Sequence, residues 1–145
     1  MISERIYRLI DKIAGLTVFI IAMLTYMLTL EPTVSYWDCG EYVAQAAMLE
    51  VGHPPGNPIF MLAGRVFCNF ASDATQFALM VNAMSGVLSA LTILLLFWTI
   101  TMLVSRFCKK ERGYSLASVI AVIGSGVVGS LAYTWSDTFW FSAVE

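Results

Sequence analysis

The chain is short, strongly apolar and poor in charge. Its 145 residues are 59% hydrophobic and only 12% charged, with a formal net charge of −2 and a mean hydropathy of +0.77. A soluble domain carries roughly a quarter charged residues, so too few are present to cover a surface that faces water. Because the charge is near neutral and no extended basic patch occurs, nucleic acid is not an expected partner. The composition predicts an all-α integral membrane protein, since spanning helices satisfy their backbone hydrogen bonds internally.

Three stretches are long and apolar enough to cross a bilayer. A spanning helix needs about 20 residues, and we expect transmembrane helices at about 13–30, 77–104 and 114–135 within a single membrane domain, 1–145. The alternative, buried helices of a soluble core, is disfavoured because no amphipathic helices remain to cover them. The first stretch has a basic start but no small-residue cleavage site, so we interpret it as an uncleaved span.

Basic residues predict how these spans are oriented. They precede the first span and fill the segment between the second and third, at Arg5, Arg8, Lys12, Arg106, Lys109, Lys110 and Arg112. The 31–76 loop carries one arginine, Arg65, among five acidic residues. By the positive-inside rule, the N-terminus is cytoplasmic and the 31–76 loop is extracytoplasmic.

The long 31–76 loop is expected to carry two short interfacial helices. The first covers about 38–51, with Asp38 as N-cap, Glu41 three residues later as in a capping box, and Gly52 as the C-terminal stop. Asn57-Pro58 is expected to open the second, which runs to about residue 70. Arg65 inside this second apolar run disfavours a fourth span and favours a helix along the membrane surface.

Small residues recur at four-residue spacing on two of the spans. Ala121, Ser125 and Gly129 follow this spacing on the third span, and Ser85 and Ser89 follow it on the second. We expect these faces to be where helices pack closely in lipid. The alternative is that the glycines near 124–129 mark a discontinuous helix.

Side chains suited to acid–base chemistry gather in the 31–76 loop. Asp38 and Glu41 are one helical turn apart on one face, and the chain's only histidine, His53, lies in the turn between the two helices. We interpret Asp38 and Glu41 as candidate catalytic carboxylates, and His53, Arg65 and Asn57 as candidate substrate-binding groups. Asn57 would begin a helix whose N-terminus can hold an anion, so the group suits a lipid-linked phosphate. The alternative is that the carboxylates only cap a helix and the histidine is solvated.

The cysteines carry little information. Cys39, Cys68 and Cys108 have no spacing that resembles a metal site, so no metal is expected. Cys39 and Cys68 lie in the same extracytoplasmic loop, where a disulfide is chemically allowed. We interpret them as two isolated thiols.

Three motifs carry a resemblance to a known family. They are SYWDCGE at 35–41, VGHPPGNP at 51–58 and TFWFSAVE at 138–145. Together they resemble the N-terminal part of a membrane family common in Bacteroidetes, formerly a domain of unknown function, which is related to the protein O-mannosyltransferases of the GT-C glycosyltransferase class. Members of that family are much longer, so we expect the chain to be a fragment, the first piece of such a protein.

The resemblance implies a function. GT-C enzymes move a sugar, here mannose, from a polyprenyl-phosphate donor to an extracytoplasmic hydroxyl, here Ser or Thr of a protein. Their first extracytoplasmic loop carries an acidic residue that acts as base or orients the acceptor, which implies that role for Asp38, with Glu41 as the alternative. No cofactor is implied beyond the donor itself.

The implied setting is the bacterial inner membrane, with the 31–76 loop in the periplasm. Partners would be membrane lipid, the lipid-linked sugar, an acceptor protein and the remaining helices of the full-length protein; the isolated segment is expected to be inactive. Two alternatives remain open, a non-catalytic membrane module and a lipid-transport subunit. Ion-coupled transport is disfavoured because the spans hold no ionisable residues.

Overall fold

The computed structural model describes residues 2–54, 56–108 and 114–145. These residues are helical apart from their connections and one isolated β-bridge between Ile2 and Tyr114. The elements in chain order are α1 (Glu4–Leu28), α2 (Cys39–Met48), α3 (Pro58–Cys68), the 3-10 turn η1 (Ala74–Gln76), α4 (Phe77–Cys108), α5 (Leu116–Thr134) and α6 (Asp137–Val144). Three of these helical stretches, α1, η1 with α4, and α5, are long and apolar enough to cross a membrane. The expected all-α fold with three candidate spans is therefore confirmed.

The long helices differ in extent from the uncharged stretches of the sequence. α1 begins at Glu4, inside the basic N-terminal segment, because Glu4 is an acidic residue in the first turn and pairs with Arg8 one turn later at 2.6 Å. α4 continues without a break to Cys108. Lys109, Lys110 and Arg112, on which the expected orientation depends, lie outside the described residues. The orientation therefore stays a prediction.

The chain divides into two compact units. Unit 1 comprises Met1–Leu24 and Ala90–Phe139, and unit 2 comprises Thr25–Ser89 and Trp140–Glu145. Unit 1 therefore contains α5 with parts of α1, α4 and α6. Unit 2 contains α2, α3 and η1 with the remaining parts of those helices.

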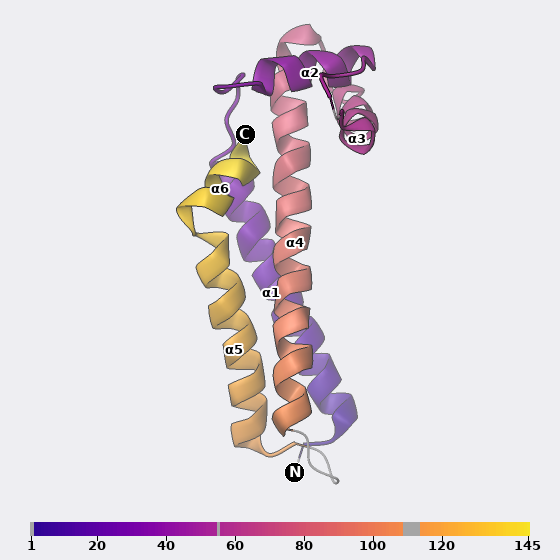
Figure 1. Cartoon of the computed structure of the whole chain (residues 1–145). Coiled ribbons are helices and arrows are strands. Elements are labelled where there is room, and N and C mark those ends of the chain that lie inside the picture. The colour runs from indigo at the N-terminus through magenta and orange to yellow at the C-terminus, as the bar shows by residue number, and fades with distance from the viewer. Residues whose placement is uncertain (1, 55, 109–113) are drawn as a thin grey trace. The chain divides into compact units, whose positions relative to one another are not determined.

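Phe97 of α4 is the central packing residue of unit 1, where α1, α4 and α5 run along one another (Figure 1). Its side chain is fully buried, and glycines on both neighbouring helices make room for it. A Cβ atom on Gly15 of α1 would lie 3.1 Å from the Phe97 ring, and one on Gly126 of α5 would lie 2.8 Å from it. Helices in lipid associate through such close approach, because lipid tails are as apolar as the side chains they would replace.

The buried face of α5 lies one residue away from the face that the sequence predicts. Its buried residues recur every four positions at Val122, Gly126, Ser130 and Thr134. Ala121 is exposed, and Ser125 and Gly129 are only partly buried. Ser130 and Thr134 pack inward because each hydroxyl donates to a carbonyl of its own helix one turn earlier. α5 is continuous, so the alternative of a discontinuous helix is wrong.

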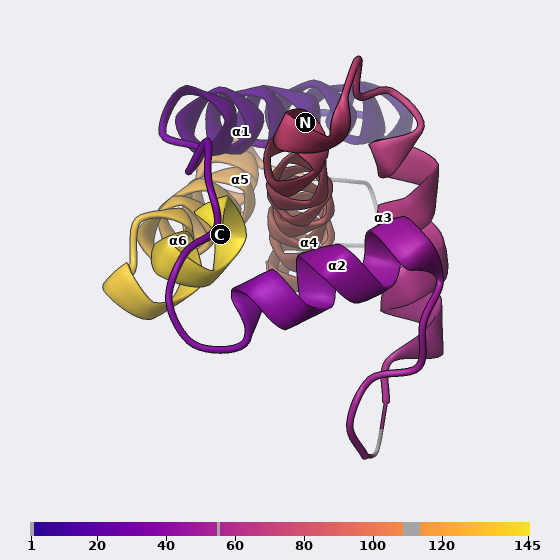
Figure 2. The same cartoon turned by 90° about the horizontal axis from the view of Figure 1, so that it is seen from above.

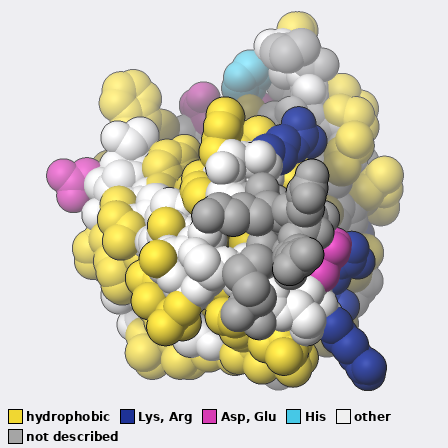
Figure 3. Space-filling model, turned by 90° about the horizontal axis from the view of Figure 1, so that it is seen from below, with side chains coloured by type: hydrophobic (Ala, Val, Ile, Leu, Met, Phe, Trp, Pro, Cys, Tyr) yellow, Lys and Arg dark blue, Asp and Glu magenta, His cyan; other side chains and the backbone are white. Residues whose placement is uncertain are grey.

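The start of the chain is joined to the start of the α5 segment within unit 1. Ile2 and Tyr114 exchange two backbone hydrogen bonds of 2.8 and 3.1 Å. The rings of Tyr7 and Tyr114 stack with centroids 4.1 Å apart. In the view from below, hydrophobic side chains cover much of the visible surface, and Lys and Arg side chains stand out near its edge (Figure 3). Ile2 and Tyr114 therefore lie at one end of unit 1.

α1 exposes a stripe of large apolar side chains. These are about half exposed and follow helical spacing, at Leu9, Ile13, Leu16, Ile20 and Leu24. Exposing such a stripe to water costs a free energy of about 25 cal/mol for every Å² of apolar surface. The hydrocarbon core of a membrane imposes no such cost. The stripe therefore supports membrane embedding of α1.

In unit 2, α2 and α3 lie side by side near the first turns of α4 (Figures 1 and 2). One apolar cluster joins the three helices, formed by Ala46, Met61, Cys68, Val81 and Met84. Gly64 of α3 permits the contact, because a Cβ atom there would lie 2.8 Å from the Cβ of Ala46. The two short helices are thus packed against each other and against α4, and at 11 residues α3 is too short to span.

α2 ends earlier than the sequence predicts. α2 stops at Met48, where Leu49 adopts a left-handed conformation with φ 56° and donates its N–H to Gln45 O. The expected stop at Gly52 is therefore wrong. The end is fixed from outside the helix, because the Arg65 guanidinium of α3 donates to Ala47 O at 2.6 Å. The predicted start of α3 at Asn57-Pro58, with the proline in the first turn, is confirmed.

The packing of unit 1 predicts a contrast between two glycines of α5. Gly126→Ala places a methyl group 2.6 Å from Thr101 Cγ2 and 2.8 Å from the Phe97 ring. We expect it to lower the free energy of unfolding by about 1–3 kcal/mol, as overpacking does. The measurement is unfolding in mixed micelles, titrated with a denaturing detergent and followed by circular dichroism.

Gly124→Ala is the matched control, because a Cβ atom at Gly124 meets nothing within 4 Å. We expect this change to be neutral or to stabilise by up to about 1 kcal/mol, through helix propensity alone. Equal effects of the two substitutions would contradict the packing role of Gly126.

Candidate functional site

The backbone that leads into the acidic motif is anchored by a buried amide of α4. Asn82 is almost fully buried, and its side-chain nitrogen donates to Glu31 O at 3.0 Å and to Thr33 O at 3.2 Å. In the sequence, Asn82 stands out only as an amide within an apolar helix. The structure shows that it holds the extended segment from which α2 begins.

The last residues of α6 contact the same segment within unit 2. Glu31 N donates to Val144 O at 3.0 Å, and the Trp140 indole donates to Thr29 Oγ1 at 2.9 Å. The Ser35 hydroxyl donates to the Glu145 carboxylate. Residues 29–35 are therefore fixed by two helices before the chain reaches Asp38.

Asp38 lies directly before α2 but does not cap it. Its side chain accepts no hydrogen bond from the first turn, and its backbone, at φ −83° and ψ 4°, lacks the extended conformation usual for an N-cap. The preceding Trp37 has φ 62°, a left-handed conformation that is rare for a bulky residue and often marks functional sites. The expected capping box is therefore wrong, and the exposed Asp38 carboxylate is left available for other interactions.

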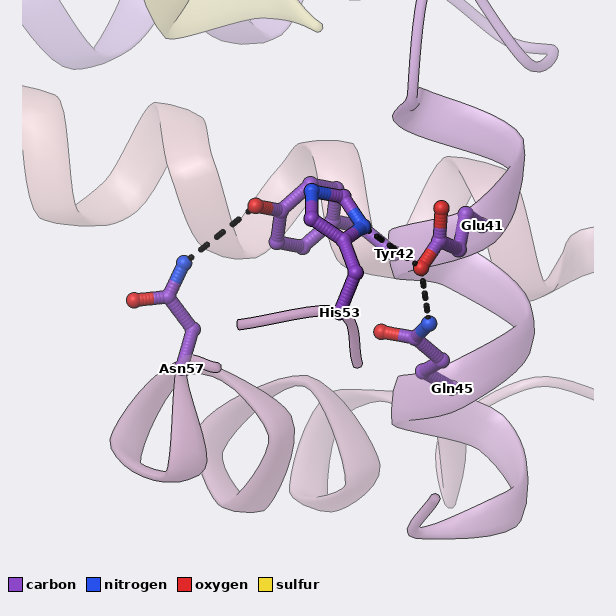
Figure 4. Close-up of polar contacts among 5 residues, drawn as sticks. All are labelled: Glu41, Tyr42, Gln45, His53 and Asn57. Carbon is purple, nitrogen blue, oxygen red and sulfur yellow. Dashed lines mark hydrogen bonds and ion pairs between the residues drawn. The ribbon is translucent and has the colours of Figure 1, made fainter. Parts of the chain in front are cut away.

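Glu41 forms an ion pair with His53 instead of closing a capping box (Figure 4). His53 Nδ1 lies 2.9 Å from Glu41 Oε1, and the Gln45 amide donates to the same oxygen. The hydrogen bond with His53 is the main cause that lowers the pKa of Glu41, followed by the one from Gln45. The same contact, with the charge of Glu41 and then of Asp38, raises the pKa of His53. The pair holds the turn after α2 against the first part of α2.

Tyr42 links this pair to the start of α3. Its hydroxyl accepts a long hydrogen bond of 3.5 Å from the Asn57 amide, and its ring lies edge-on to His53 and to Phe60, with centroids 6.4 and 5.6 Å away. Asn57 makes no side-chain cap for α3, so the first-turn N–H groups lack the partner that a cap provides. Of the predicted site residues, Glu41, His53 and Asn57 are therefore brought together around Tyr42.

Arg65 contacts the C-terminal end of α2. Its guanidinium braces the last turn of that helix through Ala47 O, whereas Glu41 and His53 meet near the first turn. The structure thus gives Arg65 a bracing role between α2 and α3.

The cysteines of unit 2 are free thiols, as the sequence interpretation expects. Burial raises the pKa of both Cys39 and Cys68, which makes them weak nucleophiles at neutral pH. Within the described ranges, no group of His, Cys, Asp and Glu side chains is arranged to hold a metal ion.

Comparison with known proteins places the acidic motif inside a recognised domain. Residues 38–145 match the family model described as the protein O-mannosyl-transferase TMEM260 N-terminal domain. The chain is 24% identical over 148 residues to protein O-mannosyl-transferase tmem260 of Dictyostelium discoideum, covering 99% of this chain. It is 29% identical over 132 residues to protein O-mannosyl-transferase TMEM260 of Mus musculus, covering 90% of this chain. No solved structure matches with comparable significance.

The chain spans 16% of the length of each of these two relatives. The matched region begins at Asp38 and includes Glu41, His53, Asn57 and Glu145, together with α4 and α5. It covers well over half of the chain and confirms the resemblance carried by the three sequence motifs. The chain belongs to the family of the protein O-mannosyl-transferase TMEM260 N-terminal domain.

Proposed function

We propose that this chain supplies the acidic loop of a glycosyltransferase that moves mannose from a polyprenyl-phosphate donor to a Ser or Thr hydroxyl of a protein. Two findings support the proposal: the family carries the name of an O-mannosyl-transferase, and the Asp38 carboxylate stands exposed and uncapped at the start of the matched region. The remaining helices of a longer protein would complete the site.

Asp38 is the better of the two candidate bases. A hydroxyl that attacks an anomeric carbon loses its proton, and a positioned carboxylate that takes it contributes typically about 10²–10⁴-fold. Glu41 is engaged by His53 and Gln45, and its lowered pKa makes it the weaker base. We assign Asp38 as the catalytic base and Glu41 as the positioning residue that holds His53.

The phosphate leaving group needs charge stabilisation and no strong acid. His53 has a raised pKa, so its positive charge persists to higher pH and is lost only as the pH rises through that raised value. Nearby, α3 begins without a side-chain cap at Asn57, and uncapped N–H groups at a helix N-terminus attract anions. His53 and the start of α3 together provide what a developing phosphate charge requires.

The donor is lipid-linked, so the site belongs at a membrane surface. The family resemblance of the sequence motifs implies a bacterial cytoplasmic membrane, and we keep that setting as part of the proposal. The charge distribution of the sequence supports an orientation with the basic N-terminus inside and the 31–76 loop outside, in the periplasm. The acceptor is then a periplasmic protein. No cofactor enters the proposal, because the lipid-linked sugar is already activated.

The assignment of Asp38 predicts a large loss of activity from a small change. In membranes that hold the whole gene product containing this segment, we expect Asp38→Asn to lower sugar transfer by about a hundredfold or more. Intact mass of the acceptor protein measures the transfer. Glu41→Gln should have a smaller effect, because it removes only the partner of His53.

Asp73→Asn is the matched control, since it removes one carboxylate from the same loop at a residue that accepts hydrogen bonds from Thr75. Its transfer should equal wild type. Unchanged transfer in an Asp38→Asn protein that inserts normally would show that Asp38 is not the base. Absence of transfer by wild type to every acceptor would favour the non-catalytic module or the lipid-transport subunit.

The ion pair predicts the titration of the chain's single histidine. We expect the pKa of His53 to lie above about 6.5, its ordinary value, and to fall back in Glu41→Gln, which removes the negative partner. NMR of the imidazole in this chain, reconstituted in lipid nanodiscs and titrated with pH, measures it. The pair is complete only above the lowered pKa of Glu41 and below the raised pKa of His53.

Glu50→Gln serves as the control for this titration, because Glu50 is an exposed carboxylate of the same loop whose charge is not among the causes of the His53 shift. It should leave the histidine pKa unchanged. A His53 pKa that responds equally to both substitutions would mean that the loop's net charge, and not the Glu41 contact, sets it.

A further inference from the structure

A cavity of about 330 Å³, which we call the polar cavity for the polar side chains set within its mainly apolar lining, lies in unit 2. α2, α3, α4, α6 and the residue after α6 all contribute to its lining. It presents amide, hydroxyl and carboxylate groups from Asn57, Asn82, Ser85 and Glu145, beside the aromatic rings of Tyr42 and Phe60. Within the described part of the chain, no Lys, Arg or His belongs to this lining.

This lining matches the chemistry of a sugar ring better than that of a phosphate. A sugar offers hydroxyl groups that donate and accept hydrogen bonds. Amide groups can donate to and accept from them, and a carboxylate can accept from them. Its apolar C–H face packs on aromatic rings. A phosphate would instead meet the Glu145 carboxylate without a compensating cation. Ligand pockets run from about 300 to 1,000 Å³, so this cavity is at the small end, where one sugar ring fits and a polyprenyl chain does not.

An apolar groove of about 450 Å³ lies beside α3 in the same unit. It is lined mainly by the α2–α3 connection and the first turns of α3, including Leu49, Val51, Met61 and Leu62. The Val51 and Leu62 side chains are 93% and 61% exposed. An exposed apolar groove of this kind favours a hydrocarbon ligand.

Asn57 belongs to the linings of both the polar cavity and the apolar groove. The two spaces therefore meet at the N-terminal end of α3. A lipid-linked sugar has the same order of parts, since its phosphate joins the sugar to the hydrocarbon. A ligand placed with its sugar in the cavity and its hydrocarbon in the groove has its phosphate at Asn57, where α3 lacks a side-chain cap.

We propose that the lipid-linked donor binds across the N-terminal end of α3, with its sugar in the polar cavity, its first isoprene units in the apolar groove and its phosphate beside Asn57. The class of ligand rests on the proposed function. The placement rests on the two linings and on the residue that they share.

The test is equilibrium binding to the whole gene product in nanodiscs, with three probes: mannose 1-phosphate, a short-chain prenyl phosphate and its mannosyl ester. Ser85→Leu fills the polar cavity, and we expect it to weaken the mannosyl ester by about tenfold or more while the prenyl phosphate stays within about twofold. Leu62→Glu puts a charge in the groove. We expect it to weaken both prenyl ligands about tenfold and to leave mannose 1-phosphate within about twofold.

Two control variants separate these effects from damage to the fold. Ser85→Ala removes one hydroxyl group of the lining without filling the cavity, so it should weaken the mannosyl ester much less than Ser85→Leu does. Val66→Glu adds a charge to an exposed position of α3 that lies outside the groove lining, and it should change no affinity. The reciprocal pattern of losses in Ser85→Leu and Leu62→Glu supports the placement.

The placement is overturned if Ser85→Leu weakens all three probes equally or none of them, or if Leu62→Glu acts no differently from Val66→Glu. It is also overturned if the mannosyl group adds no affinity to the wild-type protein. If the two variants show the reciprocal pattern but the wild-type protein transfers no sugar, the proposed function is refuted. The placement would then stand as that of a lipid-sugar binding protein.

Discussion

Two hydrogen bonds from the buried Asn82 side chain to Glu31 O and Thr33 O fix the entry to the candidate site. A buried amide left without partners costs about 1–3 kcal/mol, so α4 and this segment hold each other in one register. A hydrogen bond from Glu31 N to Val144 O joins α6 to the same segment. Asp38 follows within a few residues. Its position relative to α4 is therefore set by groups that have no part in the proposed chemistry.

The two carboxylates of the acidic motif have different roles because their surroundings differ. Glu41 faces the turn after α2 and meets His53 and Gln45, whereas Asp38 follows the left-handed Trp37 and does not cap α2. Spacing alone makes the two residues equivalent, one helical turn apart. The distinction comes from a backbone conformation at residue 37 and from a histidine twelve positions after Glu41.

The sequence predicts what depends on local pattern and on hydropathy. The long helices follow from their apolar stretches, and the start of α3 follows from Asn57-Pro58, because proline fits a first helical turn. The capping box was wrong because Asp38 lacks the N-cap conformation and Glu41 bonds to His53. The stop at Gly52 was wrong because Arg65 holds the end of α2 from another helix. The polar cavity was beyond sequence reasoning altogether. Its lining combines residues far apart in the sequence, from Cys39 at the start of α2 to Glu145 after α6.

The distribution of charge in unit 2 gives the proposed site a direction. Among the described residues, the polar cavity is lined by one carboxylate and no cation, and the apolar groove is lined mainly by apolar residues with one acidic residue, Glu50. His53 stands near Asn57 and has a raised pKa. A ligand that is neutral at one end, apolar at the other and anionic between them meets suitable groups in only one orientation. On the proposed function, that orientation puts the anomeric carbon, which is bonded to the phosphate, at the Asn57 end of the polar cavity. Binding of the lipid would then itself align the bond between the sugar and the phosphate, because the cavity is too small for the polyprenyl chain and the apolar groove disfavours the sugar.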